Sequence, residues 1–259
     1  MLENIIKPYT LAGLIGVILA AVVFIIIDKK RSYIVCKWAC FFSALIGMFI
    51  GAHLLYFIVG LPDFISSFSE RVYSFQSLLS EIAISSSGMV FYGGLFGAML
   101  GIVIFCRRLR LPLRPYLNIG CCIFPLVHAF GRIGCTLTGC CYGIEYHGIF
   151  AIQYTEEVVV QGINDHITDF PRFPVQILEC ILELMIFAAL LIIYFKTENK
   201  YSLAAIYLVV YGVIRFADEY LRGDSVRGLW GPFSTSQWIA LISILCVVIW
   251  KRRSSYSTV

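Results

Sequence analysis

Several ionisable and amide side chains of this 259-residue chain lie within or at the ends of long apolar runs. They are His53, Arg132, Gln176, Glu179, Arg215, Asp218, Glu219 and Arg222. A charge at membrane depth is costly and normally faces a helix-bundle interior or a wet cavity, so each is a candidate functional residue. The last four are spaced i, i+3, i+4 and i+7, which predicts one shared helical face. That face can carry either an internal salt bridge or a ligand site.

Arginine is the main cationic residue of this predicted site. We expect Arg132, Arg215 and Arg222, with Arg172 and Arg227, to outnumber their carboxylate partners near the same depth. A guanidinium is a planar, permanently charged fork that suits phosphate. The sequence therefore favours a site for the phosphate of a phospholipid headgroup.

The composition requires a membrane. Hydrophobic residues make up 59% of the chain and charged residues 14%, and the mean hydropathy is +0.85. These values exclude a soluble globule, a disordered chain and a collagen-like chain. A span needs about 20 apolar residues to cross the hydrocarbon core. We therefore predict an all-α integral membrane protein, formed by one polytopic domain over residues 1–259.

About seven apolar runs are long enough to be candidate transmembrane helices. They are Tyr9–Ile27, Ala39–Val59, Met89–Cys106, Tyr116–Ile133, Ile177–Phe195, Leu203–Tyr220 and Trp238–Trp250. The last run is short, and we expect its helix to begin near Ser234 to Gln237, because Ser or Thr before an apolar run is a natural N-cap. The first run is not a cleaved signal peptide, since its basic cluster follows the apolar residues.

Basic residues predict the orientation of these spans. Thirteen of the 20 Lys and Arg residues follow the first, third, fifth and seventh spans: Lys29, Lys30, Arg31, Lys37, Arg107, Arg108, Arg110, Arg114, Lys196, Lys200, Lys251, Arg252 and Arg253. By the positive-inside rule, the N-terminus is outside and the C-terminus cytoplasmic. The net charge of +4 therefore reflects orientation, and we expect no nucleic-acid partner.

Two longer segments then face outward. Residues 61–88 mix aromatic and charged side chains, which predicts an external amphipathic helix. Residues 134–175 are polar and predict a small external cap with a strand at Ile149–Tyr154. Four glycines, Gly131, Gly134, Gly139 and Gly143, predict an irregular re-entrant turn where the cap begins. By contrast, Gly97 and Gly101 are expected to serve helix packing.

Three of the ten cysteines, Cys135, Cys140 and Cys141, crowd the same glycine-rich turn. A structural disulfide or free thiols is the favoured interpretation, with a metal or redox site and a direct part in chemistry as alternatives. The C-x4-C-C spacing is no standard zinc motif, and vicinal cysteines rarely pair with each other. We therefore expect no metal and no cofactor, and expect the other cysteines to be packing residues.

Four sequence blocks, in this order, resemble the bacterial prolipoprotein diacylglyceryl transferases. They are FYGGL (91–95), GRIGCTLTGCCYG (131–143), FPVQILE (173–179) and YGVIRFADEYLRGD (211–224) followed by STSQ (234–237). The resemblance covers roughly residues 45 to 250, and the two arginine blocks are its specific part.

The resemblance implies an activity. Family members transfer the diacylglyceryl group of phosphatidylglycerol to the lipobox cysteine thiol of a preprolipoprotein, and release glycerol phosphate outside the bacterial cytoplasmic membrane. The expected partners are phosphatidylglycerol, preprolipoprotein signal peptides and the bilayer, with the active site outward. By motif position the implied catalytic residues are Arg132, Arg215 and Tyr92, and the implied substrate-binding residues are Arg132, Gly143, Glu219, Arg222, Gly93, Gly94 and Gln176.

The chain departs from the family pattern at three positions. Tyr92 stands where the family has histidine, Cys135 where it has asparagine, and Cys140 where it has glutamate. An ordinary tyrosine has a pKa near 10, so the base that activates the thiol is either a perturbed Tyr92 or another residue such as His128.

Two alternative functions remain. One is a divergent paralogue with the same lipid-phosphate site and a different acceptor. The other is a membrane thiol oxidoreductase, although the second outward cysteine pair that it needs is absent from the sequence. A transporter is disfavoured because the chain has no repeated halves.

Overall fold

The computed structural model describes residues 8–27, 34–71, 88–155, 167–197, 202–224 and 228–256, and the single residues 74, 76, 78, 79 and 82. The chain forms two compact units. The bundle unit comprises residues 1–27 and 121–259, and the helix-pair unit comprises residues 28–120. Helix α5 (Leu113–Thr138) is divided between the two units after Gly120.

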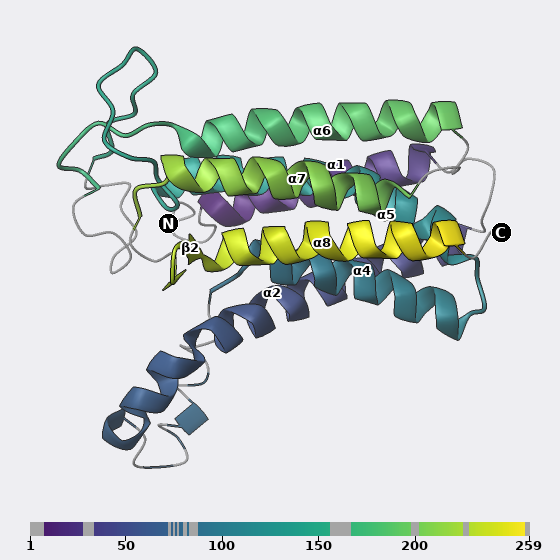
Figure 1. The fold of residues 1–259 in the computed structure, drawn as a ribbon, viewed down its shortest axis with the longest axis horizontal. Coiled ribbons are helices and arrows are strands. Elements are labelled where there is room, and N and C mark those ends of the chain that lie inside the picture. Colours follow the sequence, from purple (N-terminus) through teal and green to yellow (C-terminus); the bar gives the residue numbers. More distant parts are fainter. Residues whose placement is uncertain are drawn as a thin grey trace, which may run out of the picture. The chain divides into compact units, whose positions relative to one another are not determined.

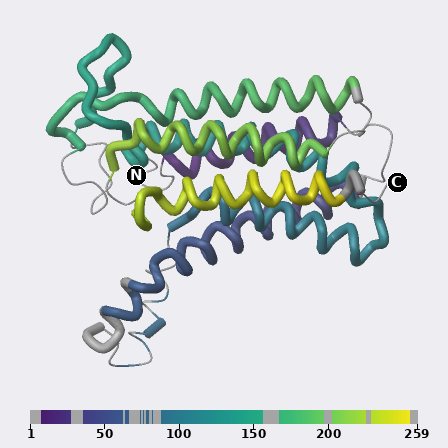
Figure 2. The backbone as a smooth tube through the Cα atoms, in the orientation of Figure 1, coloured from purple at the N-terminus to yellow at the C-terminus, as the bar shows by residue number. Residues whose placement is uncertain are grey.

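The helix-pair unit is built on close contact between α2 (Ile34–Arg71) and α4 (Phe91–Arg108). A Cβ on Gly51 would clash with the carbonyl oxygen of Gly93, and one on Gly97 with that of Gly47. Gly101 meets the Ser43 carbonyl in the same way. The predicted packing role of Gly97 and Gly101 is therefore confirmed. Figure 2 shows α2 continuing beyond the part that pairs with α4.

The bundle unit consists of α1 (Pro8–Ile27), the later part of α5, α6 (Val175–Thr197), α7 (Leu203–Asp218) and α8 (Thr235–Tyr256). Figure 1 shows α6, α7 and α8 side by side. The start of α1, the end of α5, the start of α6, the end of α7 and the start of α8 lie at one end, which we call the site end (Figure 1). Lys196 and Arg253 lie in the last turns of α6 and α8, at the opposite end.

The start of α8 shows how local sequence sets a helix boundary. A two-stranded hairpin, β1 (Leu229–Trp230) with β2 (Phe233–Ser234), leads into the helix. The Gln237 amide N–H donates to Ser234 Oγ at 3.2 Å, and the Ser234 N–H donates to Gln237 Oε1 at 3.0 Å. This reciprocal pair is a capping box. The predicted early start of the last span is therefore confirmed.

Six helices among the described residues are long and apolar enough to cross a membrane. They are Pro8–Ile27, Cys36–Pro62, Phe91–Arg108, Leu113–Thr138, Val175–Lys196 and Thr235–Arg253. The all-α membrane architecture is thus confirmed, whereas the count of seven is not. The run expected at 203–220 forms α7, of only 16 residues, followed by the 3-10 turn η1 (Glu219–Leu221).

The structure corrects several expected boundaries. Helix α5 continues through Gly131 and Gly134 to Thr138, so the irregular turn starts only at Gly139. Within the described part of the cap, Ile149–Tyr154 forms no strand but a single bridge from Ile152 to Arg172. The cap instead has a small core of Tyr142, Ile152, Tyr154 and Ile167.

The first part of the segment 61–88 does not form a separate helix. Residues 61–71 belong to α2, which contains Pro62 and ends at Arg71. Much of the remainder lies outside the described residues. Its external position remains a prediction.

Candidate functional site

A buried ion pair joins α5 to α6 near the site end. Arg132 Nη2 donates to Glu179 Oε1 at 2.9 Å, and the two side chains are 8% and 2% exposed. Tyr211 on α7 donates its hydroxyl to the same carboxylate oxygen at 3.2 Å. A buried charge needs such partners, because removing it from water is costly. Glu179 therefore holds Arg132 in place and ties three helices together.

The other two arginines also have carboxylate partners. Arg215 Nη2 lies 2.6 Å from Glu219 Oε2 and donates to Ser236 Oγ at 3.4 Å. Arg222 pairs with Asp224 through both Nε and Nη2. For Arg132, Arg215 and Arg222 the expected excess of arginines over carboxylates is therefore wrong, because each of these three is paired with a carboxylate.

The expected shared helical face is wrong as well. Helix α7 ends at Asp218, and Arg222 follows the 3-10 turn with extended backbone. Arg215 and Glu219 keep their i, i+4 pairing, whereas Arg222 forms a bridge to Gly143. Of the remaining predicted arginines, Arg172 stacks over the Tyr142 ring within the cap, at 4.9 Å from its centroid, and Arg227 lies outside the described residues.

A second group of polar side chains, on α5, α6 and α7, lies one helical turn from the Arg132–Glu179 ion pair. His128 Nδ1 lies 2.9 Å from Glu183 Oε1, and His128 Nε2 lies 3.6 Å from Glu179 Oε1. The Tyr207 hydroxyl donates to Glu183 at 3.4 Å. His128 is thus held between two glutamates, as a packed and partnered histidine.

Two guanidinium groups keep unused donors. Arg132 Nε and Arg215 Nη1 are buried and have no hydrogen-bond partner among the described residues. Both arginines lie within electrostatic range of Glu179, as does Arg222. Buried guanidinium N–H groups that have no acceptor in the described part of the chain can donate to the oxygens of an anion. The cluster is therefore suited to a phosphate group.

Gly143 and Gln176 connect the arginine cluster to the cap. Gly143 forms a backbone bridge to Arg222, and Gln176 bonds to residues of the cap. A Cβ on Gly143 would clash with the Phe173 carbonyl, and one on Gly223 with the Gly143 carbonyl. Gly143 must therefore be glycine because three backbone segments meet there. Gln176 is 1% exposed, and its Nε2 donates to the Cys140 carbonyl at 2.9 Å and to the Tyr154 hydroxyl at 3.2 Å.

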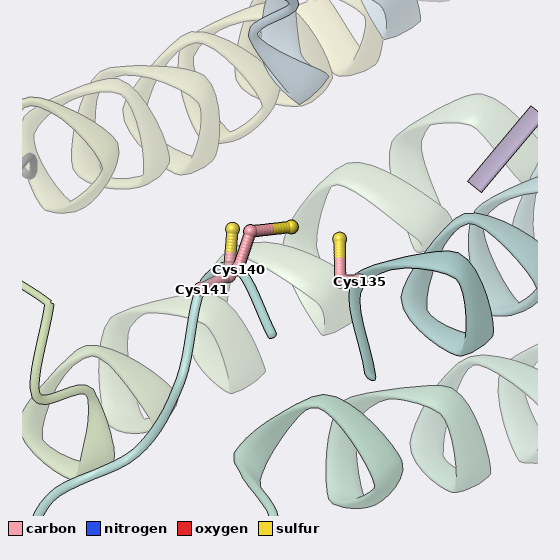
Figure 3. Close-up of side chains that lie close together, drawn as sticks. All are labelled: Cys135, Cys140 and Cys141. Atoms are coloured by element: carbon pink, nitrogen blue, oxygen red, sulfur yellow. The ribbon is translucent and has the colours of Figure 1, made fainter. Parts of the chain in front are cut away.

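The three cysteines of the turn converge. The Sγ atoms of Cys135, Cys140 and Cys141 all lie within 4.8 Å of one another, and Figure 3 shows them on one side of the turn. All three are free thiols. The expected crowding is therefore real, and the structural disulfide is absent from this turn.

The thiols after α5 have different acidities. Hydrogen bonds from the Cys135 and Cys140 thiols, with the positive charges of Arg222 and Arg132, lower the pKa of Cys141 well below its usual value. The hydrogen bond with Cys135 lowers the pKa of Cys140, but that with Cys141 and burial outweigh it and raise it to about 11. Burial raises the pKa of Tyr154 to about 12. Cys141 is therefore the thiol of this turn that ionises most readily.

The remaining predicted site residues belong to the helix-pair unit. Tyr92 is buried at the start of α4, stacked on Phe96. Gly93 packs against the Gly51 backbone and Gly94 against Met48, so helix packing already accounts for both glycines. His53 makes an edge contact with Phe49 at 4.4 Å between ring centroids. Substrate contacts of these residues remain predictions.

Sequence reasoning missed several members of the bundle-unit site. Glu183, Tyr207 and Tyr211 form its polar interior, and their i, i+4 spacing from Glu179 and from each other was the available signal. Tyr9 was also missed. It packs on Gly134 and lies within electrostatic range of Cys135 and Arg132. Nothing local marks Tyr9, which lies in the first turn of the apolar helix α1.

An apolar pocket of about 270 Å³ lies against the same two helices. It is lined by Ile133, Thr136, Leu137, Ile177 and Cys180. Its lining residues belong to the same parts of α5 and α6 that carry Arg132 and Glu179.

Comparison with known proteins gives one consistent result. The family model for prolipoprotein diacylglyceryl transferase matches residues 2–251. A phosphatidylglycerol–prolipoprotein diacylglyceryl transferase of Clostridium tetani is 29% identical over 234 residues, which cover 89% of this chain and 86% of that protein. The enzyme of Ehrlichia ruminantium (strain Welgevonden) is 24% identical, over 94% of this chain and 89% of its own.

A shorter match is slightly more similar. The enzyme numbered 2 of Clostridium perfringens is 31% identical over 160 residues, which cover 61% of this chain and 59% of that protein. The family match spans almost the whole sequence and includes every residue of the arginine cluster. The chain therefore belongs to the prolipoprotein diacylglyceryl transferase family.

Proposed function

We propose that this protein transfers the diacylglyceryl group of phosphatidylglycerol to the lipobox cysteine thiol of preprolipoproteins. The observation that carries the proposal is the pair of buried arginines, Arg132 and Arg215, each with an N–H that has no acceptor among the described residues. The names of the related enzymes, which specify this reaction, support it.

The chemistry needs charge stabilisation at the phosphate. The thiolate of the acceptor attacks a glycerol carbon, a C–S bond forms, and the C–O bond to the phosphate breaks. Negative charge then accumulates on the departing glycerol phosphate. Preorganised donors in a water-poor site stabilise such charge strongly. Arg132 and Arg215 supply these donors, while Glu179 and Glu219 hold the two guanidinium groups in position.

Arg222, Gly143 and Gln176 shape the rim of the same site. Arg222 adds positive charge near the cluster, and the bridge from Gly143 to Arg222 fixes its backbone. By motif position we also assign a catalytic role to Tyr92 and a substrate-binding role to Gly93 and Gly94, all of the helix-pair unit. The apolar pocket between α5 and α6 accepts part of a lipid acyl chain.

The protein is a multi-pass protein of the bacterial cytoplasmic membrane, with the site on the extracytoplasmic side. Support comes from the basic residues Lys196 and Arg253, which end α6 and α8 away from the site end. We assign α7 with η1 as the seventh span, since α7 lies beside α6 and α8 in the bundle unit (Figure 1). Residues 139–175 form the external cap.

The test is transfer in proteoliposomes that contain phosphatidylglycerol and a lipobox peptide. We expect the wild type to form the thioether product, and Arg132→Ala and Arg215→Ala each to lower the rate by roughly 10²–10³-fold, as expected for loss of a preorganised donor. Arg108→Ala, at an exposed arginine that ends α4, serves as the matched control and keeps full activity.

Absence of thioether product with folded wild-type protein would overturn the proposal. A different outcome, in which both arginine variants keep wild-type rates, would retain the reaction but remove the arginine pair from its centre.

A further inference from the structure

We propose that Cys135, Cys140 and Cys141 form a three-thiolate zinc site whose fourth position takes the thiol of the acceptor cysteine. The metal site stands on the geometry of the turn, and its use in binding the acceptor rests on the proposed function above.

The distance between the sulfur atoms is the first support. Zn²⁺ binds thiolates at about 2.3 Å, so two sulfurs of a tetrahedral site lie about 3.8 Å apart. The three Sγ atoms already lie within 4.8 Å of one another, on one side of the turn (Figure 3). Small side-chain rotations complete the approach. The C-x4-C-C spacing resembles no common zinc motif because the last turn of α5, and not a knuckle, brings Cys135 to the pair.

The backbone of the turn is held in an unusual conformation. Gly139 and Cys141 have φ angles of 68° and 57°, and for cysteine this left-handed region is uncommon. Such strain persists where surrounding contacts fix it, and it clusters at functional sites. Here the Cys140 N–H donates to the Cys135 carbonyl at 3.1 Å, and Gln176 holds the Cys140 carbonyl. The surrounding hydrogen bonds thus preorganise the three thiols.

Charge supports the same assignment. Three thiolates and Zn²⁺ carry a net charge of −1, and a fourth thiolate makes it −2. Arg132 and Arg222 are positive and within electrostatic range of Cys141. Both guanidinium groups are also paired with a carboxylate, Glu179 or Asp224, and their proximity lowers the electrostatic cost of an anionic metal–thiolate centre.

A site with three protein ligands matches a chemical need of the reaction. Catalytic zinc sites keep one coordination position open, and a coordinated thiol is deprotonated outright. The acceptor thiol thus loses its proton to solvent on binding. Its sulfur then forms the C–S bond as the C–O bond to phosphate breaks, and the metal is neither oxidised nor reduced. Coordination to zinc therefore activates the acceptor thiol without the histidine that the family has at the position of Tyr92.

The binding test uses the full chain in detergent micelles, reduced with a phosphine, and Cd²⁺ as the spectroscopic probe. We expect one equivalent of Cd²⁺ to produce the near-ultraviolet absorption of cadmium–thiolate bonds, and Zn²⁺ to compete for the site. Cys135→Ser, Cys140→Ser and Cys141→Ser should each lower the absorption by about a third or more. Cys246→Ser, at an exposed cysteine of α8, is the matched control. Circular dichroism establishes that each variant is folded.

The acceptor test adds a lipobox peptide, or the same peptide with serine in place of its cysteine, to the Cd²⁺-loaded protein. We expect the cysteine peptide alone to raise the absorption by about a third. Absence of the band in reduced wild type, or a band unaffected by the three variants, would overturn the site. An equal response to both peptides would overturn its role in acceptor binding. Neither readout uses transfer, so failure of the transferase assay is a separate result.

Discussion

Glu179 is the residue on which the buried charges of the site depend. It accepts from Arg132 at 2.9 Å and from Tyr211 at 3.2 Å, and it lies 3.6 Å from His128. Each of these partners comes from a helix other than its own. Loss of this single carboxylate therefore affects both the position of Arg132 and the packing of the bundle unit.

We predict that Glu179→Ala destabilises the protein by about 3–5 kcal/mol, because it leaves the Arg132 charge buried without a counterion. Thermal unfolding of purified protein in detergent measures the effect. Glu145→Ala is the matched control, since the Glu145 side chain is 50% exposed in its pair with His147, and it should change stability by less than about 1 kcal/mol. Equal effects of the two substitutions would contradict this account of the ion pair.

Gly143 belongs to the arginine-block motif but acts through backbone packing. We predict that Gly143→Ala lowers both the yield of folded protein and its unfolding temperature, because the new methyl group meets the Phe173 carbonyl. The measurement is size-exclusion chromatography after heating.

The control for this prediction lies in the same motif. A Cβ on Gly131 would meet nothing within 4 Å, so Gly131→Ala should remain as stable as the wild type. If Gly143→Ala matched the wild type in both measurements, the close backbone approach would not be required.

At the scale of elements, the glycine faces of α2 and α4 decide how the helix-pair unit forms. Gly47 and Gly51 meet Gly93 and Gly97 with backbone against backbone. Without a hydrophobic driving force between helices in lipid, such close van der Waals contact is the main source of association. The same contact positions the start of α4, where Tyr92 lies.

We predict that Gly51→Ala separates this helix pair locally and lowers the unfolding temperature, because the methyl group clashes with the Gly93 carbonyl. Gly60→Ala on the same helix is the matched control, because nothing lies within 4 Å of its Cβ position. Thermal unfolding monitored by circular dichroism compares the two variants. A smaller effect for Gly51 than for Gly60 would show that α2 and α4 do not depend on this contact.

At the scale of the whole molecule, the arginine cluster and the basic helix ends occupy opposite ends of the bundle unit. Arg132 and Arg215 lie at the site end, whereas Lys196 and Arg253 lie in the last turns of α6 and α8. The distribution of lysine and arginine orients helices across the membrane. The bundle therefore places its arginine cluster away from the basic ends of α6 and α8.

We predict that the C-terminus is cytoplasmic and that the cap is extracytoplasmic. Green fluorescent protein fused after Val259 should fluoresce, and alkaline phosphatase at the same position should be inactive. Alkaline phosphatase fused after Tyr154, in a truncated chain, should be active. The reverse pattern at both positions would contradict the orientation.

The sequence alone determined the features that depend on local composition. The sequence predicts the first span at Tyr9–Ile27, and the helix is Pro8–Ile27; it predicts the fifth at Ile177–Phe195, and the helix is Val175–Thr197. The early start of α8 followed from Ser234 and Gln237, which cap each other three residues apart. The apolar length of a span and the cap of a helix end both depend only on residues of one segment. These boundaries can therefore be predicted from the sequence.

Only the tertiary structure decided which residues meet. Arg132 pairs with Glu179, 47 residues away, so the arginines are paired and not in excess. The end of α7 at Asp218 removes Arg222 from the helical face that spacing predicted. Cys135 joins Cys140 and Cys141 because α5 continues to Thr138 before the chain turns. These three results depend on the residue at which a helix ends and on the helix that packs beside it. Long-range contacts determine both features, and local residue spacing does not.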